Sequence, residues 1–223
     1  MQECIVVEDA VKRFRDVTAL DHVSLSLERG KIHGIIGRNG SGKSVLFKCI
    51  CAFMYLDSGN IYVEGKKVRA VGEHEMGILI ENPGFISSMS GYQNLKMLAD
   101  IKRKIGKEDI RNVMDCVGLD PDNKKSVGKY SKGMKQRLGI AQAIMESPDI
   151  LILDEPMNGL DRRGVEEIRS LLSKLREDGK TILLTSHYSE DINLLCDTIC
   201  ELDGGRVINS QVIDKKAGAV AES

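Results

Sequence analysis

The sequence has no long hydrophobic run, no secretory signal and no cysteine pair of metal-binding type. Of its 223 residues, 42% are hydrophobic and 29% are charged, which is ordinary for a globular protein. The longest mostly apolar stretch, Val45 to Leu56, is interrupted by Lys48 and falls short of the roughly 20 apolar residues that cross a bilayer. Met1 to Cys4 lack the basic start and apolar core of a signal peptide. We therefore expect a cytosolic chain that reaches any membrane through a partner.

Net charge is also nearly absent. The formal value of −1 gives no indication of a nucleic-acid partner. The segment between Lys96 and Arg137 contains twelve Lys and Arg and six Asp and Glu, which we interpret as a solvated helical face. The cysteines have no CxxC spacing and no nearby histidines of metal-ligand type, so we expect small buried hydrophobic side chains. They are Cys4, Cys49, Cys51, Cys116, Cys196 and Cys200.

The hydrophobic pattern changes twice along the chain. Up to about residue 84 it is typical of short strands; Val23, Leu25 and Leu27, for example, alternate with polar residues as in an antiparallel strand. Glycines separate helical patterns over about 85–145, and strands and helices alternate afterwards, which favours a largely parallel sheet. The prediction is an α/β fold with a nucleotide-binding core (about 1–84 and 146–223), an N-terminal antiparallel β subdomain and an inserted helical subdomain (about 85–145). The predicted elements include helices at 43–53, 92–101, 108–117, 131–145 and 164–176, strands at 76–80, 150–153 and 181–185, a helix capped by Ser189, a hairpin at 203–204 and a frayed tail at 215–223.

The strongest signal is the segment GRNGSGKS from Gly37 to Ser44, a complete GxxxxGK[ST] P-loop. It follows a predicted buried strand and opens a helix, so backbone N–H groups and the helix N-terminus can surround phosphates. Lys43 would bring positive charge to them, and the Ser44 hydroxyl can ligate Mg²⁺. The residues expected to bind ATP here are Gly37, Asn39, Gly40, Ser41, Gly42, Lys43 and Ser44.

A second signal is ILILDE, from Ile150 to Glu155. Four apolar residues that end in two carboxylates indicate a buried strand opening on the ligand edge of a sheet. Asp154 would hold Mg²⁺, and Glu155 would polarise an attacking water. An acidic turn after a core strand would explain this feature alone, but not together with the P-loop.

The segment YSKGMKQRL at 130–138 resembles the signature sequence of ABC cassettes, which is usually Leu-Ser-Gly-Gly-Gln followed by Gln-Arg. Other features of that family follow in the same order. Phe14 lies where an aromatic residue stacks on adenine, Asn158 to Asp161 match the D-loop, and His187 ends a strand as the switch histidine does. With five motifs in order over nearly the whole chain, the sequence resembles the ATP-binding cassettes of ABC transporters.

The resemblance implies a head-to-tail dimer that buries two ATP molecules, with ATP and Mg²⁺ as cofactors. Ser131 and Gly133 would donate to the γ-phosphate held by the opposite subunit, and Asp161 would lie at the dimer seam. Glu155 and His187 would be the catalytic residues, His187 by contacting the γ-phosphate in its own subunit. The partners would be a second copy and an integral-membrane permease, with no nucleic acid. The expected location is peripheral, at the cytoplasmic face of the cell membrane, and the isolated chain should be soluble.

The sequence departs from the family pattern at two places. Most cassettes have glutamine where this chain has Glu81, which we regard as a tentative Mg²⁺ ligand whose charge the metal would offset. The segment from Ile80 to Phe85 resembles that of the branch of cassettes that exports bacitracin-like and lantibiotic peptides. A neutral substitution in a generic exporter is the alternative. In the signature, Lys132 replaces Gly and Met134 replaces Gln; the lysine could lie near the nucleotide or face solvent. We expect a permease to dock near residues 81–93.

The resulting hypothesis is a transport ATPase, with export as the direction of transport. One alternative is a non-transport ABC ATPase that clamps nucleic acid or a ribosome. About a hundred residues separate Ser44 from Asp154, with no sustained heptads, which disfavours a DNA clamp with a long coiled coil. The other alternative is a regulatory ATP-binding subunit with little catalysis. The presence of Glu155 and His187 disfavours it.

Overall fold

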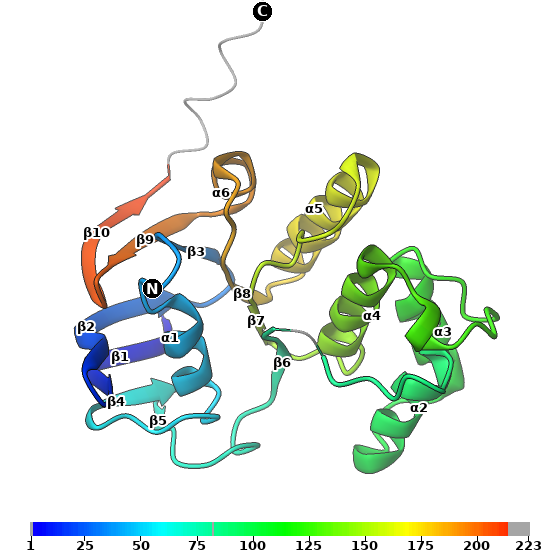
Figure 1. Ribbon diagram of the computed structural model, residues 1–223, viewed down its shortest axis with the longest axis horizontal. Helices are drawn as coiled ribbons and strands as arrows, with labels where there is room; N and C mark the ends of the chain where they lie inside the picture. Colours follow the sequence, from blue (N-terminus) through cyan, green and yellow to red (C-terminus); the bar gives the residue numbers. More distant parts are fainter. Residues whose placement is uncertain (1, 82, 214–223) are drawn as a thin grey trace, which may run out of the picture.

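A computed structural model describes residues 2–81 and 83–213, which form two β-sheets and a set of helices (Figure 1). Across these residues, no helix combines the length and the apolar character that a membrane crossing requires. The larger sheet has six strands in the order β10-β9-β3-β8-β7-β6, and all neighbours except the β10–β9 pair are parallel. The strands are β3 (Ile32–Ile36), β6 (Met76–Leu79), β7 (Ile150–Leu153), β8 (Thr181–Leu184), β9 (Thr198–Asp203) and β10 (Arg206–Val212).

The central strands of this sheet are apolar because both of their faces are covered. All residues of β7 and β8 are buried. Along β7, Ile150 and Ile152 pack into one hydrophobic cluster, and Leu151 and Leu153 into the other, as the two-residue period of a strand requires. One cluster includes residues of α5 (Arg162–Glu177) and α6 (Ser189–Leu195), and the other includes residues of α1 (Lys43–Ile50).

The smaller sheet is antiparallel, in the order β2-β1-β4-β5, and confirms the expected N-terminal β region. Its strands are β1 (Glu3–Phe14), β2 (Val17–Glu28), β4 (Ser58–Val63) and β5 (Lys66–Lys67). Val23 and Leu27 of β2 are buried, and the polar residues between them are exposed. Both belong to the cluster that contains α1, so this sheet and the larger one enclose α1 between them.

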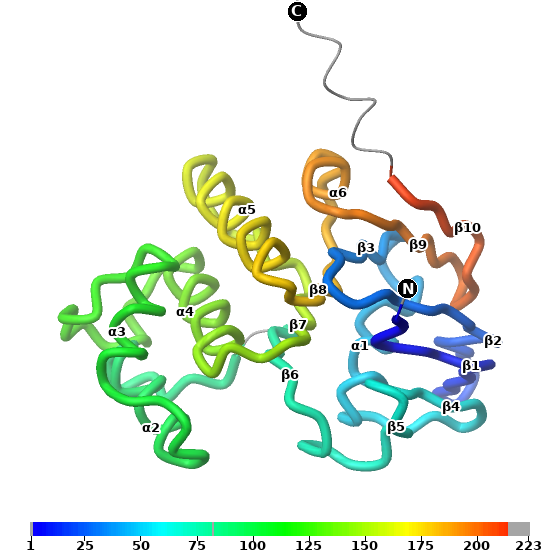
Figure 2. Tube along the Cα trace, turned by 180° about the vertical axis from the view of Figure 1, so that it is seen from behind, coloured from blue at the N-terminus to red at the C-terminus, as the bar shows by residue number. Residues whose placement is uncertain are grey.

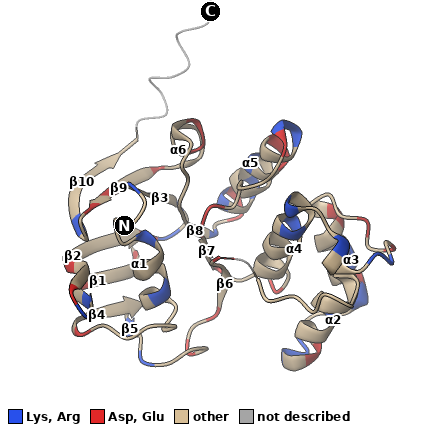
Figure 3. Ribbon diagram, in the orientation of Figure 1, with Lys and Arg blue, Asp and Glu red and all other residues tan. Residues whose placement is uncertain are grey.

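The helices α2 (Gly91–Lys102), α3 (Lys107–Cys116) and α4 (Lys132–Ile144), with a 3₁₀ turn at Val127–Lys129, connect β6 to β7. In both Figure 1 and Figure 2 they lie together on the side of the larger sheet away from the antiparallel sheet. Their buried side chains share one hydrophobic cluster with Leu79 and Leu151 of the sheet. Lys, Arg, Asp and Glu occur together on α3 and on α5 (Figure 3). The division into a core and a helical subdomain stays a prediction.

Most expected element ends lie within two residues of the observed ones, and two expectations are wrong. The first helix ends at Ile50 and not at residue 53, because Ala52 has a φ of 58, outside the helical region. Ser189 begins α6, and its N-cap is Tyr188, whose side chain makes no capping hydrogen bond. The expected tail at 215–223 lies outside the described residues.

Five of the six cysteines are buried, as expected, and Cys116 is exposed. Burial raises the pKa of the Cys49 thiol to about 11 and that of Cys51 to about 12. These thiols therefore stay protonated at neutral pH and behave as small hydrophobic side chains.

Candidate nucleotide site

The predicted phosphate loop connects β3 to α1. Gly37 at its start has a φ of 145, and a Cβ there would lie 2.1 Å from the carbonyl O of Leu202, so only glycine fits. The Lys43 side chain folds back over the loop. Its Nζ donates to the carbonyl O of Gly37 at 2.7 Å and to that of Arg38 at 3.0 Å. The ammonium is therefore placed inside the curve of the loop.

A cavity of about 260 Å³ opens in front of this loop. It brings together residues from the loop, from the end of β7 and from the segment after β8; the lining residues are Val17, Ala19, Asn39, Gly40, Ser41, Gly42, Lys43, Ser44, Val45, Asp154, Glu155 and His187. Gly37 is not among them. The Ser41 Oγ is buried and has no hydrogen-bond partner among the described residues, so the loop offers a polar group that a bound phosphate could use.

Asp154 is fixed by two hydroxyl groups. Ser44 Oγ donates to Oδ2 at 2.7 Å, and Thr185 Oγ1 donates to Oδ1 at 2.6 Å. Thr185 was missed in the sequence, although a signal existed. It follows β8 directly, and the parallel register pairs Leu153 with Leu184, so the next residues of both strands meet at the sheet edge.

Glu155 has a φ of 51, a left-handed conformation that is unfavourable for a residue with a side chain. Its amide donates to Thr185 Oγ1 at 2.9 Å, and its Oε2 accepts from the His187 amide at 3.2 Å. The other oxygen, Oε1, lies 3.3 Å from His187 Nε2 but accepts no hydrogen bond among the described residues. Burial raises the pKa of this carboxyl, and the nearby His187 partly offsets the rise. A half-buried carboxylate with an available acceptor oxygen is suited to hold a water.

The signature residues lie elsewhere. Ser131 caps α4 and accepts from the Met134 amide at 3.1 Å, and Asp161 caps α5 and accepts from the Gly164 amide at 2.9 Å. Neither they nor Gly133 line the cavity of their own chain.

Phe14 and Glu81 do not line the cavity either. Phe14 is 41% exposed, with the Lys12 ammonium 5.6 Å from its ring centre. Glu81 pairs at the surface with Lys48 of α1, at 2.5 Å. Of its two expected positions Lys132 takes the solvent-facing one: its side chain is exposed, and its Nζ donates to Asn158 Oδ1 at 2.8 Å. Within 2–81 and 83–213, no three His, Cys, Asp or Glu residues gather as metal ligands.

The residues on either side of His187 are fixed by a hydrogen-bond network around a buried carboxylate. Asp191 is fully buried; its Oδ2 accepts from Ser186 Oγ at 2.6 Å, and its Oδ1 accepts from Arg169 Nε at 2.8 Å. The Ser186 hydroxyl in turn accepts from the Tyr188 amide at 3.1 Å. The backbone on both sides of His187 is therefore tied to α5 and α6.

We expect Asp191→Ala to lower the free energy of unfolding by about 3–5 kcal/mol, because it leaves the mostly buried Arg169 without its buried partner. Glu190→Gln is the matched control, since Glu190 also contacts Arg169 but is exposed, and it should change little. Urea unfolding of both variants measures the difference. Equal, small effects would show that the Asp191 pair does not stabilise the fold.

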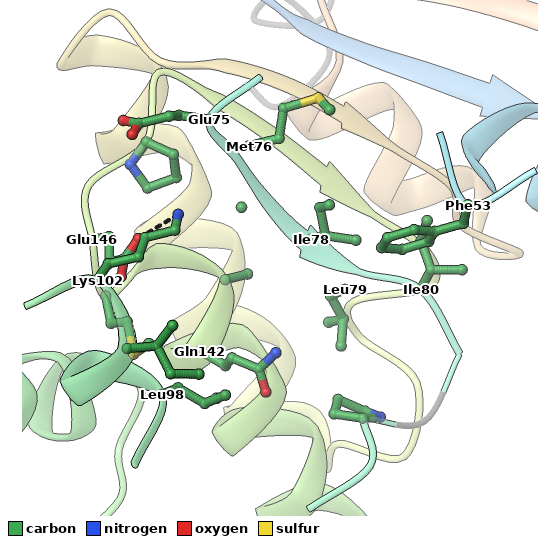
Figure 4. Close-up of a pocket in the computed structure, with 16 residues that line it drawn as sticks. Phe53, Glu75, Met76, Ile78, Leu79, Ile80, Leu98, Lys102, Gln142 and Glu146 are labelled. Carbon is green, nitrogen blue, oxygen red and sulfur yellow. Dashed lines mark hydrogen bonds and ion pairs between the residues drawn. The ribbon is translucent and has the colours of Figure 1, made fainter. Parts of the chain in front are cut away.

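A second hollow, a groove of about 390 Å³, runs along β6, which is the edge strand of the larger sheet (Figure 4). Phe53 and Ile80 lie close together at one end, and an ion pair of 2.9 Å joins Lys102 to Glu146 toward the other. Phe53 is 49% exposed. The groove therefore has an apolar middle with charges at one end; its lining residues are Phe53, Glu75, Met76, Gly77, Ile78, Leu79, Ile80, Pro83, Leu98, Ile101, Lys102, Gln142, Ala143, Met145, Glu146 and Pro148.

Comparison with known protein families decides what this arrangement is. Residues 20–158 match the family model described as ABC transporter. The chain belongs to the ABC transporter family. The match confirms the resemblance to ABC transporters that the sequence motifs indicated.

Its relatives include proteins named for bacitracin transport and for lantibiotic transport. It is 38% identical to the bacitracin transport ATP-binding protein BcrA of Enterococcus faecalis, over 93% of this chain and 69% of that protein. It is 33% identical to the lantibiotic transport ATP-binding protein SrtF of Streptococcus pyogenes, over 93% of this chain and 90% of the relative. The resemblance of the chain to this branch is therefore confirmed.

Solved cassettes have the same fold. The dimeric post-hydrolysis structure of the ATP-binding cassette MJ0796 bound to ADP and Pi superimposes with a TM-score of 0.86 at 22% identity, over 94% of this chain and 99% of that one. The structure of cbiO1 from Clostridium perfringens, described as part of the transporter complex cbiONQ, gives 0.81 at 29% identity, over 95% and 89%. The α/β P-loop architecture predicted from the sequence is confirmed.

Proposed function

We propose that this ABC cassette binds and hydrolyses ATP as the motor subunit of an exporter of antimicrobial peptides. The observation that carries the proposal is that Lys43, Ser44, Asp154, Glu155 and His187 line one cavity. The peptide substrate class follows the names of the relatives. The chain would work at the cytoplasmic face of the membrane, bound to a permease.

The loop would bind the phosphates of ATP. Residues 37–44 supply backbone N–H groups and the N-terminus of α1, and Lys43 can turn its ammonium from the loop carbonyls to the phosphates. Phe14, exposed at the end of β1, would stack on adenine. The Ser44 hydroxyl and the Asp154 carboxylate, already 2.7 Å apart, fit the all-oxygen ligand set of Mg²⁺. Bound Mg²⁺ would neutralise charge on the phosphates.

Glu155 and His187 would carry the hydrolytic step. The Oε1 atom of Glu155 would accept a proton from the attacking water as general base. His187 would hold the γ-phosphate, because its ring is already directed to the same cavity and its backbone is fixed from both sides. Thr185 would position the carboxylate of Asp154 and the backbone of Glu155.

A second copy would complete each site. Ser131 and Gly133, which do not reach their own cavity, would donate to the ATP of the opposite subunit, and Asp161 would lie at the seam. Their places at the first turns of α4 and α5 direct backbone N–H groups outward, where an anion is favoured.

The groove along β6 would receive a helical cytoplasmic segment of the permease. Its lining includes Ile80 and Pro83, at the start of the region where docking is expected. Apolar side chains in its middle, with Phe53 and Ile101 exposed at its rim, suit the apolar face of an amphipathic helix. The Lys102–Glu146 pair would fix the direction of that helix.

The test is Mg²⁺-dependent ATP hydrolysis by the purified chain as a function of its concentration. The rate per molecule should rise with concentration, because each site needs two subunits. A rate independent of concentration would contradict the dimer. ATP binding without turnover, even in membranes that contain the permease, would favour a regulatory subunit. A pull-down that recovers ribosomes or DNA with the chain, and no membrane protein, would overturn the proposed role in transport.

We expect Glu81→Gln to change the rate of hydrolysis less than about fivefold, because the Glu81 carboxylate is exposed and pairs with Lys48 away from the cavity. Lys48→Met, which removes the other partner, should behave alike. Titration of ATPase activity with Mg²⁺ measures both. A large rise in the Mg²⁺ requirement of Glu81→Gln alone would make Glu81 a metal ligand.

A further inference from the structure

Helix α4 is fastened to the segment that follows β7 at two successive turns. Lys132 Nζ donates to Asn158 Oδ1 at 2.8 Å. Gln136 Nε2 donates to the carbonyl O of Glu155 at 2.9 Å and to that of Pro156 at 3.0 Å. Lys132 and Gln136 are four residues apart and so lie on one face of the helix. The signature helix and the catalytic segment of the same chain therefore meet along that face.

The carbon stem of Lys132 fits against Gly159. A Cβ on Gly159 would lie 2.7 Å from both Cγ and Cδ of Lys132, and the φ of Gly159 is 81. A larger residue at 159 would thus clash and be strained. Gly133 also approaches closely, since a Cβ there would lie 3.0 Å from the carbonyl O of Gly159. The contact involves the lysine stem as well as its charge.

A lysine at this position is electrostatically unfavourable. Lys132 is the first residue of α4, where the helix dipole disfavours positive charge, and the first turn contains no acidic residue. Lys132 is itself exposed. In the part of the chain that the structure describes, its ammonium forms no ion pair, so solvent and the Asn158 amide oxygen offset this cost. The neighbouring Lys135 is exposed on the same helix and makes no side-chain hydrogen bond within those residues.

We propose that Lys132 is a positioning residue that, with Gln136, makes the signature turn and the segment 155–159 move as one unit. The inference depends on the proposed dimer in its functional part. When Ser131 engages the ATP of the opposite subunit, the displacement of α4 is transmitted through these contacts to Glu155 beside the subunit's own ATP. The two sites are thereby coupled through each chain.

The contact is tested first in the ATP-free chain by hydrogen exchange, which needs no activity. The Leu160 amide donates to the carbonyl O of Met157 at 3.2 Å and reports the order of the segment. Lys132→Met and Asn158→Ala should each speed its exchange about three- to tenfold, whereas the matched Lys135→Met should not. Exchange that is unchanged in Lys132→Met overturns the contact, whatever the function of the protein.

Coupling is tested by ATP hydrolysis at saturating protein concentration. Lys132→Met and Asn158→Ala should each lower the Hill coefficient for ATP and reduce kcat about three- to tenfold, and the double variant should lose no more than either single one. Additive losses, or a silent Asn158→Ala beside an impaired Lys132→Met, would overturn the inference, because the ammonium would then act on the nucleotide itself. A wild-type rate independent of protein concentration would contradict the dimer instead.

Discussion

Glu155→Gln should reduce ATP turnover about 10²- to 10⁴-fold and leave ATP binding intact. The reason is that the amide keeps the size and the contacts of the carboxylate but cannot accept a proton from water. The Oε1 atom of Glu155 lies buried beside His187 and accepts no hydrogen bond within the described part of the chain, so it has capacity for that water. Steady-state hydrolysis and equilibrium binding of labelled ATP measure the two quantities separately.

Glu177→Gln is the matched control, because it removes an exposed carboxylate at the end of α5 without touching the cavity. Its turnover should equal that of the wild type. If Glu155→Gln hydrolysed ATP at the wild-type rate, Glu155 would not be the base. Loss of ATP binding in Glu155→Gln would show instead that the variant disturbs the phosphate loop.

The same variant should stabilise the nucleotide-free and metal-free fold. Burial raises the pKa of Glu155 above its unfolded value, so the ionised carboxylate disfavours folding. That cost is absent below the unfolded pKa, develops as the pH rises to the folded pKa and is constant above it. Urea unfolding should therefore show Glu155→Gln more stable than wild type at neutral pH, with the difference vanishing in acid.

Lys43→Met should weaken ATP binding about 10- to 100-fold. The buried Lys43 ammonium donates charge-assisted hydrogen bonds. A hydrogen bond to a charged group contributes about 1.5–3 kcal/mol. In the free chain these bonds go to the carbonyl groups of Gly37 and Arg38, and the methionine keeps the stem while removing all donors. Isothermal titration with ATP, in the presence and absence of Mg²⁺, gives the change in affinity.

Arg38→Met is the control for net charge, because Arg38 belongs to the same loop, its side chain is exposed, and only its carbonyl contacts Lys43. Its affinity for ATP should stay within about twofold of wild type at physiological salt, where exposed charges are largely screened. Similar losses in both variants would mean that the loop attracts ATP by overall charge and not through the Lys43 donors.

The sequence predicted the elements whose pattern is local. The loop from Gly37 to Ser44 and the strand Ile150–Leu153 before Asp154 were placed correctly, because glycine spacing and a four-residue apolar run are patterns of neighbouring residues. Helix ends were less predictable. The first helix stops at Ile50 because Ala52 turns out of the helical region, and no proline or glycine marks that point.

What the sequence by itself determined is the family and the set of residues at the phosphate end of the site, since their types and order are those of an ABC cassette. The tertiary structure decided which side chains meet. Thr185 contacts Asp154 because parallel strands bring their carboxyl ends to one edge of the sheet. Glu81 lies outside the cavity and pairs with Lys48. Lys132 reaches Asn158 because α4 packs beside the segment after β7, a contact between residues 26 apart that no local pattern encodes.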